Sequence, residues 1–152
     1  MYVDAFEDGK RRIYSVSASG GEPRFLWEGS DPIEAPGHKL LLYEKPDGRG
    51  IYGRSLVGDA AKNPERLLVA DYQSPWGGFY PVDDGIYYAG YGSTGLPRAF
   101  RFYSFSAGRS VDIAPSPPNL ELGLTVTPDG TQLAYSTKSQ GSEDLVQIEL
   151  KK

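Results

Sequence analysis

Three aromatic residues and one arginine in the middle of the chain have the side chains expected of a binding site. Tyr72 and Trp76 lie in one segment rich in turn-forming residues, and Tyr91 lies in a second such segment, shortly before Arg98. Such side chains anchor protein partners and sugar rings because they offer a large rigid contact area at low conformational entropy cost. These four residues are the candidate binding site. The alternative is that Trp76 packs between neighbouring sheets and contacts no ligand.

No set of residues in the sequence is arranged for catalysis or for binding a metal. The sequence has one histidine, His38, and no cysteine, and the Gly-x-Ser-x-Gly pattern of a hydrolase nucleophile does not occur. His38 stands between Gly37 and Lys39, where a solvated turn residue is expected. A metal site would depend on carboxylate oxygens, which suit Ca²⁺ at best. We therefore expect no catalytic residue, no metal site and no cofactor.

Two further patterns resemble functional motifs but fit turns better. Adjacent acids occur at Asp83-Asp84 and at Glu143-Asp144, and general acid-base chemistry needs carboxyl groups that face each other across a pocket. Residues 90–95 match the glycine pattern of dinucleotide-binding loops, which requires a helix that begins at the last glycine. Leu-Pro-Arg and an aromatic run follow instead. We expect a hairpin turn at Asp83-Asp84-Gly85 and a loop at 90–95.

The composition is that of a globular protein without a nucleic-acid or membrane partner. The 152 residues are 39% hydrophobic and 24% charged, with a net charge of −4, and the lysines and arginines are scattered. A phosphate backbone is bound by clustered basic residues, so no nucleic-acid partner is expected. The chain has no signal-peptide core and no apolar run long enough to span a bilayer. We therefore expect no membrane insertion, and either a cytoplasmic or a periplasmic location fits the sequence.

A sequence repeat predicts the β-strands that carry these side chains. A proline is followed five residues later by Leu or Ile and seven residues later by Tyr, three times over: Pro36/Leu41/Tyr43, Pro81/Ile86/Tyr88 and Pro128/Leu133/Tyr135. The tyrosines lie 45 and 47 residues apart, a period typical of a four-stranded β-propeller blade. The 19 glycines and 12 prolines also favour short strands and tight turns.

The repeat predicts two complete blades and two partial ones. Each complete blade has four strands, A to D, rich in β-branched and aromatic residues. The predicted strands are 2–6, 12–16 and 24–27; 33–35, 39–43, 50–54 and 66–69; 78–82, 86–89, 100–105 and 111–113; and 124–126, 132–135 and 145–150. The blade boundaries are accordingly 1–29 (BCD), 30–70 (ABCD), 71–115 (ABCD) and 116–152 (ABC).

Strand direction explains why the aromatic candidates are expected together. Strands A and C run one way and strands B and D the other, so the D-to-A loop at 71–77 and the B-to-C loop at 90–97 emerge on one face. That arrangement predicts Tyr72, Trp76 and Tyr91 at a common rim, with Arg98 close behind.

The chain resembles the TolB-like family of WD-type β-propeller repeats. That family has a Ser-Pro-Asp-Gly turn, which Thr127-Pro128-Asp129-Gly130 matches closely, and a Gly-Gly-x-Pro-Arg turn, which residues 20–24 match. The turns at residues 37–39 and 82–85 depart from the pattern. Such repeats occur in translocation-complex subunits, in prolyl-oligopeptidase-like peptidases and behind DNA-binding or kinase domains of bacterial regulators, so the resemblance implies a fold and not one activity.

The resemblance and the incomplete blades together imply a function in binding. Rings contain about four to eight closed blades, so we expect the C-terminal part of a larger TolB-like propeller that serves as a non-catalytic interaction or scaffold module. The expected partner is another protein, or another copy of the chain that completes the ring. Two alternatives stay open: a prolyl-oligopeptidase-like hydrolase whose catalytic domain lies outside this chain, and a sugar or small-ligand site at the aromatic rim.

Overall fold

The computed structural model describes residues 1–47, 49–73, 78–91, 97–127, 129–139 and 141–150. In these ranges the regular elements are antiparallel β-strands and one short 3-10 helix, η1 (Ala60–Lys62), which confirms the predicted all-β class. The chain divides into two compact units, residues 1–70 and 71–152, and each is described by itself. No helix in the described part of the chain is long and apolar enough to cross a membrane.

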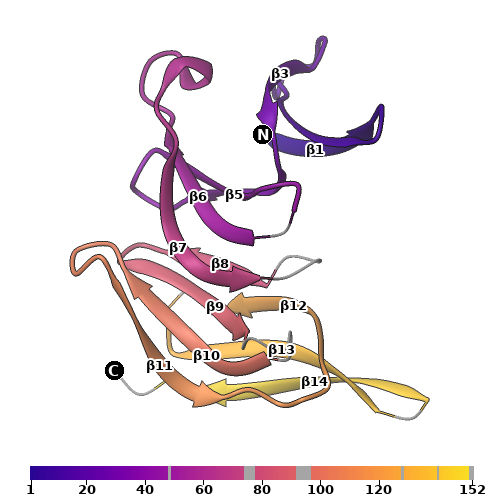
Figure 1. Ribbon diagram of the computed structural model, residues 1–152, viewed down its shortest axis with the longest axis vertical. Coiled ribbons are helices and arrows are strands. Elements are labelled where there is room, and N and C mark those ends of the chain that lie inside the picture. The colour runs from indigo at the N-terminus through magenta and orange to yellow at the C-terminus, as the bar shows by residue number, and fades with distance from the viewer. Residues whose placement is uncertain (48, 74–77, 92–96, 128, 140, 151–152) are drawn as a thin grey trace. The chain divides into compact units, whose positions relative to one another are not determined.

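The first unit contains a three-stranded sheet and most of a four-stranded sheet (Figure 1). The three-stranded sheet has the order β1-β2-β3, with the bounds β1 (Tyr2–Glu7), β2 (Lys10–Ser15) and β3 (Arg24–Glu28). The four-stranded sheet has the order β4-β5-β6-β7, with the bounds β4 (Ser30–Ala35), β5 (Leu40–Glu44), β6 (Arg49–Ser55) and β7 (Arg66–Gln73).

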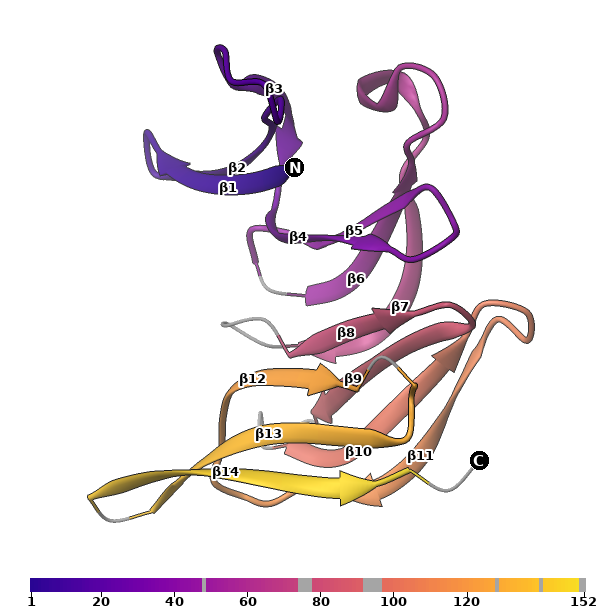
Figure 2. The same cartoon turned by 180° about the vertical axis from the view of Figure 1, so that it is seen from behind.

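The second unit repeats this plan in the opposite order (Figure 2). Its four-stranded sheet runs β11-β10-β9-β8, with the bounds β8 (Phe79–Val82), β9 (Gly85–Tyr91), β10 (Pro97–Ser104) and β11 (Arg109–Pro115). Its three-stranded sheet runs β12-β13-β14, with the bounds β12 (Leu120–Val126), β13 (Gln132–Ser139) and β14 (Ser142–Glu149). The described strands thus confirm two complete and two partial blades, while the blade boundaries stay predictions.

The repeated Leu/Ile and Tyr residues supply the inward face of one strand in each of three sheets. Side chains two residues apart on a strand point to the same face, and these pairs lie on β5, β9 and β13. All six are buried: Leu41, Tyr43, Ile86, Tyr88, Leu133 and Tyr135. Burial of each such side chain stabilises the fold by roughly 1.5–3 kcal/mol, so the repeat marks packing positions.

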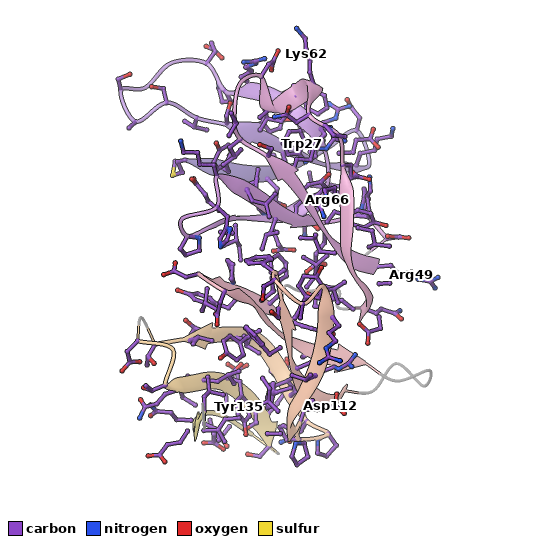
Figure 3. The ribbon with its side chains drawn as sticks, turned by 90° about the vertical axis from the view of Figure 1, so that its left-hand side faces the viewer. Trp27, Arg49, Lys62, Arg66, Asp112 and Tyr135 are labelled. Carbon is purple, nitrogen blue, oxygen red and sulfur yellow. The ribbon has the colours of Figure 1, made fainter. Side chains whose placement is uncertain are left out.

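Each unit has an apolar core between the faces of its two sheets. In the first unit, Ile13 and Trp27 pack with Leu41 and Tyr43 of the neighbouring sheet. In the second unit, Phe100 packs with Leu124, Val126, Leu133 and Tyr135. Trp27 and Tyr135 are labelled in Figure 3, one in each core. Face-to-face packing of successive sheets is the arrangement that propeller blades require.

The turn before β9 differs from the expected one in the position of its glycine. Val82 pairs with Gly85, so Asp83 and Asp84 alone form the turn and Gly85 already belongs to the strand. Its backbone is outside the left-handed region, which is the region that favours glycine on conformational grounds. Glycine is required there by space, because a Cβ would overlap the Tyr103 carbonyl oxygen and approach Phe102 Cζ to 2.5 Å.

Candidate functional site

Tyr72 lies in the interior of the protein and not at a surface rim as expected from the sequence. Strand β7 continues to Gln73, which places Tyr72 in the strand with 1% of its surface exposed. Its ring makes edge contacts with Phe79 at 5.8 Å and Tyr88 at 6.2 Å between ring centroids, and its hydroxyl accepts a hydrogen bond from the Gly78 N–H at 2.8 Å. Tyr72 is therefore a packing residue, and its ring is not available to a partner.

Two other candidate residues are brought close together by strand pairing. Tyr91 is the last residue of β9 and pairs with Pro97, the first residue of β10, and Arg98 follows directly. The end of the β9–β10 pair thus carries both backbone positions, and the common rim of their side chains stays a prediction. Trp76 and residues 92–96, which hold most of the glycine pattern, lie outside the described residues.

His38, Asp83 and Asp84, which were weighed for catalysis, lie in turns between strands. His38 is exposed in the turn between β4 and β5, where its N–H donates to the Ala35 carbonyl at 3.3 Å. Asp83 and Asp84 form the β8–β9 turn. In the part of the chain that the structure describes, no group of three or more His, Asp and Glu side chains is placed to hold a metal ion.

A buried tyrosine hydroxyl organises a polar network in the first unit. The Tyr43 hydroxyl donates to Glu65 Oε2 at 2.5 Å and accepts from Arg54 Nε at 3.0 Å. Lys45 Nζ donates to the same carboxylate oxygen at 2.7 Å. Burial opposes ionisation of Glu65, but the hydrogen bonds from Lys45 and Tyr43 prevail and lower its pKa. The pKa of Tyr43 is raised, first by burial and then by its bond to Glu65.

A second network of the same kind lies in the second unit. The Tyr88 hydroxyl makes hydrogen bonds to Asp71 Oδ1 at 3.1 Å and Ser110 Oγ at 2.8 Å. Arg101 pairs with Asp71, and its Nε donates to Asp112 Oδ1 at 2.7 Å. Burial raises the pKa of Tyr88. Because the charged groups of both networks are paired with one another, the networks favour a structural role over acid-base catalysis.

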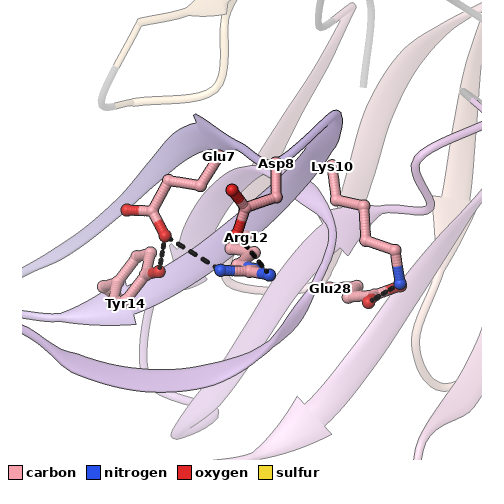
Figure 4. Close-up of polar contacts among 6 residues, drawn as sticks. All are labelled: Glu7, Asp8, Lys10, Arg12, Tyr14 and Glu28. Atoms are coloured by element: carbon pink, nitrogen blue, oxygen red, sulfur yellow. Dashed lines mark hydrogen bonds and ion pairs between the residues drawn. The ribbon is translucent and has the colours of Figure 1, made fainter.

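The outer face of the β1-β2-β3 sheet carries a cluster of charged and aromatic side chains (Figure 4). We define the first-sheet outer face by the residues Glu7, Lys10, Arg12, Tyr14, Phe25 and Glu28. Lys10, Arg12 and Tyr14 alternate along β2 with Ile13, whose side chain points into the core, so they point to the opposite face. Sequence reasoning missed this surface, although the alternation along β2 is a readable signal.

The contacts of the first-sheet outer face hold its side chains in place. Glu7 Oε2 accepts from the Tyr14 hydroxyl at 2.6 Å and from Arg12 at 3.1 Å, and these bonds lower the pKa of Glu7. Lys10 Nζ lies 2.6 Å from Glu28 Oε1. The Tyr14 and Phe25 rings are in edge contact with centroids 5.8 Å apart, and Phe25 is 49% exposed. The face therefore presents an aromatic pair, Tyr14 and Phe25, together with the ion pairs Arg12–Glu7 and Lys10–Glu28.

Comparison with known proteins supports the fold independently. A crystal structure of TolB from Acinetobacter baumannii superposes on the chain with a TM-score of 0.72 at 16% sequence identity, over 97% of this chain and 37% of that one. No protein-family model matches the chain, and no curated protein matches it in sequence. The chain has a TolB-like β-propeller fold, as its turn motifs predicted, and it spans little more than a third of the length of that TolB chain.

Proposed function

We propose that this chain is a non-catalytic interaction module of β-propeller type, part of a larger TolB-like propeller, and that its first-sheet outer face binds another protein. The observation that carries the proposal is the exposed Phe25 ring, which contacts Tyr14, whose hydroxyl shares the Glu7 carboxylate with Arg12. Tyrosine and arginine are enriched among the residues that dominate binding energy at protein interfaces. Ion pairs around an aromatic centre give specificity through charge complementarity.

The same proposal holds that this chain carries no catalytic residues of its own. The polar networks around Tyr43 and Tyr88 pair their acids and bases internally, and His38 lies in the turn between β4 and β5. The alternative of a prolyl-oligopeptidase-like hydrolase places every catalytic residue in a domain outside this chain. A reading frame that encodes such a domain beside these sheets would favour that alternative, and a frame with further blades alone would favour the interaction module.

The proposal is tested with Phe25→Ala and a matched control, Leu67→Ala. Leu67 is an exposed apolar residue of similar exposure, 52%, on β7. The purified wild type and both variants are immobilised and exposed to a lysate of the source cells, and bound proteins are quantified by mass spectrometry. We expect at least one protein to be retained by the wild type and Leu67→Ala and to be reduced at least tenfold by Phe25→Ala. Equal retention by all three would refute binding at this face.

A second candidate surface is the end of the β9–β10 pair, which we propose as a small-ligand or sugar site. Support comes from the pairing of Tyr91 with Pro97, which brings Tyr91 and Arg98 to one strand end. Binding to a panel of immobilised glycans, measured for the wild type and for Trp76→Ala and Arg98→Ala, tests it. Binding that needs both side chains supports the site, and binding unchanged in both variants removes it.

A further inference from the structure

Trp27 carries a buried hydrogen-bond donor that no described residue satisfies. The residue lies on β3, pairs with Ile13 of β2 and is 6% exposed. Its indole N–H is buried and donates to no acceptor in the described part of the chain. Buried tryptophan N–H groups normally find a partner, because an unsatisfied buried donor is costly. The indole therefore calls for an acceptor that the described residues do not supply.

Arg54 adds two more donors beside the indole. Its guanidinium lies over the Trp27 ring, with Cζ 4.7 Å from the ring centroid. Arg54 Nε donates to the Tyr43 hydroxyl at 3.0 Å, Nη1 to the Asn63 carbonyl at 3.1 Å and Nη2 to Glu65 at 3.4 Å. Because a guanidinium has five N–H groups, one N–H on each terminal nitrogen has no acceptor among the described residues. The Arg54 side chain is 20% exposed, so these donors are not sealed from solvent.

The connection from β6 to β7 covers this part of the core (Figure 3). It folds back so that η1 lies against β3, and Leu56 and Ala60 pack on the cluster that contains Trp27. Next to η1, Asp59 forms an exposed ion pair with Arg24 of β3 at 3.0 Å. Exposed ion pairs add little stability, so the connection can open at this pair and admit a small molecule.

Asn63 closes this connection on itself without using β3. Its side-chain amide donates to the Ser55 carbonyl at 2.7 Å and to the Val57 carbonyl at 2.9 Å. Gly58 has a φ of 75°, and a Cβ there would meet no described atom within 4 Å. The connection is thus held by its own hydrogen bonds and keeps its shape when it moves away from β3.

Positive charge is in excess around the Trp27–Arg54 stack. Two carboxylates lie near it, on Asp59 and Glu65, and each is shared by two cations. Four cationic side chains thus meet two carboxylates, in a chain whose net charge is −4. An excess of one sign of charge attracts a ligand of the other sign, so an anion is favoured over a neutral acceptor. The ion pairs are Arg24–Asp59, Lys62–Asp59, Lys45–Glu65 and Arg54–Glu65, with N···O distances of 3.0, 3.3, 2.7 and 3.4 Å.

We propose that Trp27 and Arg54 bind the carboxylate of a small organic anion, which enters beneath the β6–β7 connection. A carboxylate has two oxygens in one plane, the geometry that a guanidinium recognises. The indole N–H and the two remaining Arg54 N–H groups satisfy both oxygens. A phosphate has more oxygens than these donors satisfy, and an unsatisfied buried oxygen is costly. The site therefore selects a carboxylate over a phosphate.

This inference goes beyond the proposed function. Trp27 packs in the core of the first unit, on the face of the β1-β2-β3 sheet opposite the first-sheet outer face. Its test uses a small anion and no protein partner. Either proposal can therefore fail while the other stands.

The indole N–H of Trp27 is itself the reporter of binding. The chain has two tryptophans, so the Trp76→Phe protein gives a single indole cross-peak in a nitrogen–proton NMR spectrum. Sodium succinate is titrated at constant ionic strength, and succinamide, which has a similar shape but no charge, is the control. We expect a saturable downfield shift of the indole proton with succinate and none with succinamide. No saturable shift with succinate, as when the indole binds water alone, or equal shifts with both compounds would overturn the proposal.

Inorganic phosphate tests the class of anion in the same titration. We expect it to bind at least tenfold more weakly than succinate, because its additional oxygens find no donor. Phosphate binding as tight as that of succinate would contradict a carboxylate site.

Three variants locate the site, with the backbone amide cross-peak of Ala61 as the readout. Trp27→Phe keeps an aromatic ring without the N–H and is expected to weaken succinate binding at least tenfold. Asp59→Asn keeps a residue that caps η1 but removes the carboxylate that competes for Arg24, so binding should tighten at least threefold. Asp84→Asn, the same charge change in the β8–β9 turn, should leave the affinity unchanged.

The gain of affinity guards against a trivial loss through misfolding, since a misfolded variant does not bind more tightly. Unchanged affinity in Trp27→Phe would overturn the role of the indole N–H. Equal tightening by Asp59→Asn and Asp84→Asn would trace the effect to net charge alone and contradict entry at the Arg24–Asp59 ion pair.

Discussion

At the scale of single residues, the repeated tyrosines combine packing with polar ordering. The Tyr43 and Tyr88 rings are buried in their sheets, and each hydroxyl meets a carboxylate: Glu65 for Tyr43 and Asp71 for Tyr88. The regular spacing of these tyrosines in the sequence predicted their packing role, because one inward position per blade needs a large side chain. It did not predict their polar partners, since Glu65 and Asp71 follow no repeat.

The hydroxyl of Tyr43 is expected to stabilise the fold measurably. Tyr43→Phe keeps the ring but removes the hydrogen bond to the charged Glu65 carboxylate, which should lower the free energy of unfolding by about 1.5 kcal/mol. Urea unfolding measures the change. The control is Tyr52→Phe, because Tyr52 pairs with Tyr43 across the strands and stacks on it. Equal stabilities of the two variants would contradict the role given to the hydroxyl.

Asp129 should titrate at an unusually low pH. Hydrogen bonds from the Thr127 hydroxyl and from Thr131 lower its pKa from 3.8 to about 2. Since the folded pKa is depressed, its stabilising effect is complete above the unfolded value and is lost as the pH falls from about 4 to 2. An NMR titration of the carboxyl carbon tests this, with Thr127→Val expected to raise the pKa. A midpoint near 3.8 in the wild type would show that these bonds do not form.

At the scale of elements, the strands were predictable and their ends were not. Alternating apolar residues and turn signals indicated where the sheets lie, but β7 was expected to end at residue 69 and continues to Gln73. Main-chain pairing can extend a strand beyond its apolar run. Because β7 is extended in this way, Tyr72, which was expected in a loop, lies in the strand and is buried in the core. The first-sheet outer face was missed because charged residues on a strand look like an ordinary solvated face until their contacts are known.

Gly85 provides a prediction about strand packing. A Cβ at this position overlaps the Tyr103 carbonyl oxygen, which is backbone and has little freedom to move, so Gly85→Ala should prevent cooperative folding of the second unit. Gly108→Ala is the control, because its Cβ would meet nothing within 4 Å and its positive φ of 63° costs only about 1–2 kcal/mol. Thermal unfolding followed by circular dichroism compares them, and a Gly85→Ala protein at least as stable as Gly108→Ala would contradict this packing.

At the scale of the whole molecule, this chain has the same architecture as part of TolB although the two sequences differ at most positions. The similarity to TolB extends over 97% of this chain at 16% identity. A blade needs only inward apolar positions, tight turns and strand pairing, and many sequences supply these. For the same reason the period of the tyrosines predicted the architecture, while the binding surfaces depend on residues outside the repeat.

The central claim is that successive sheets pack face to face as propeller blades, and ring-to-ring nuclear Overhauser effects test it most directly. We predict cross-peaks between Trp27 and Tyr43, whose ring centroids are 5.4 Å apart in adjacent sheets, and between Phe100 and Tyr135, which are 4.7 Å apart. Tyr87 and Phe102, 4.7 Å apart within one sheet, provide the internal reference. If the reference cross-peak is present and both inter-sheet cross-peaks are absent, the blades do not pack as described.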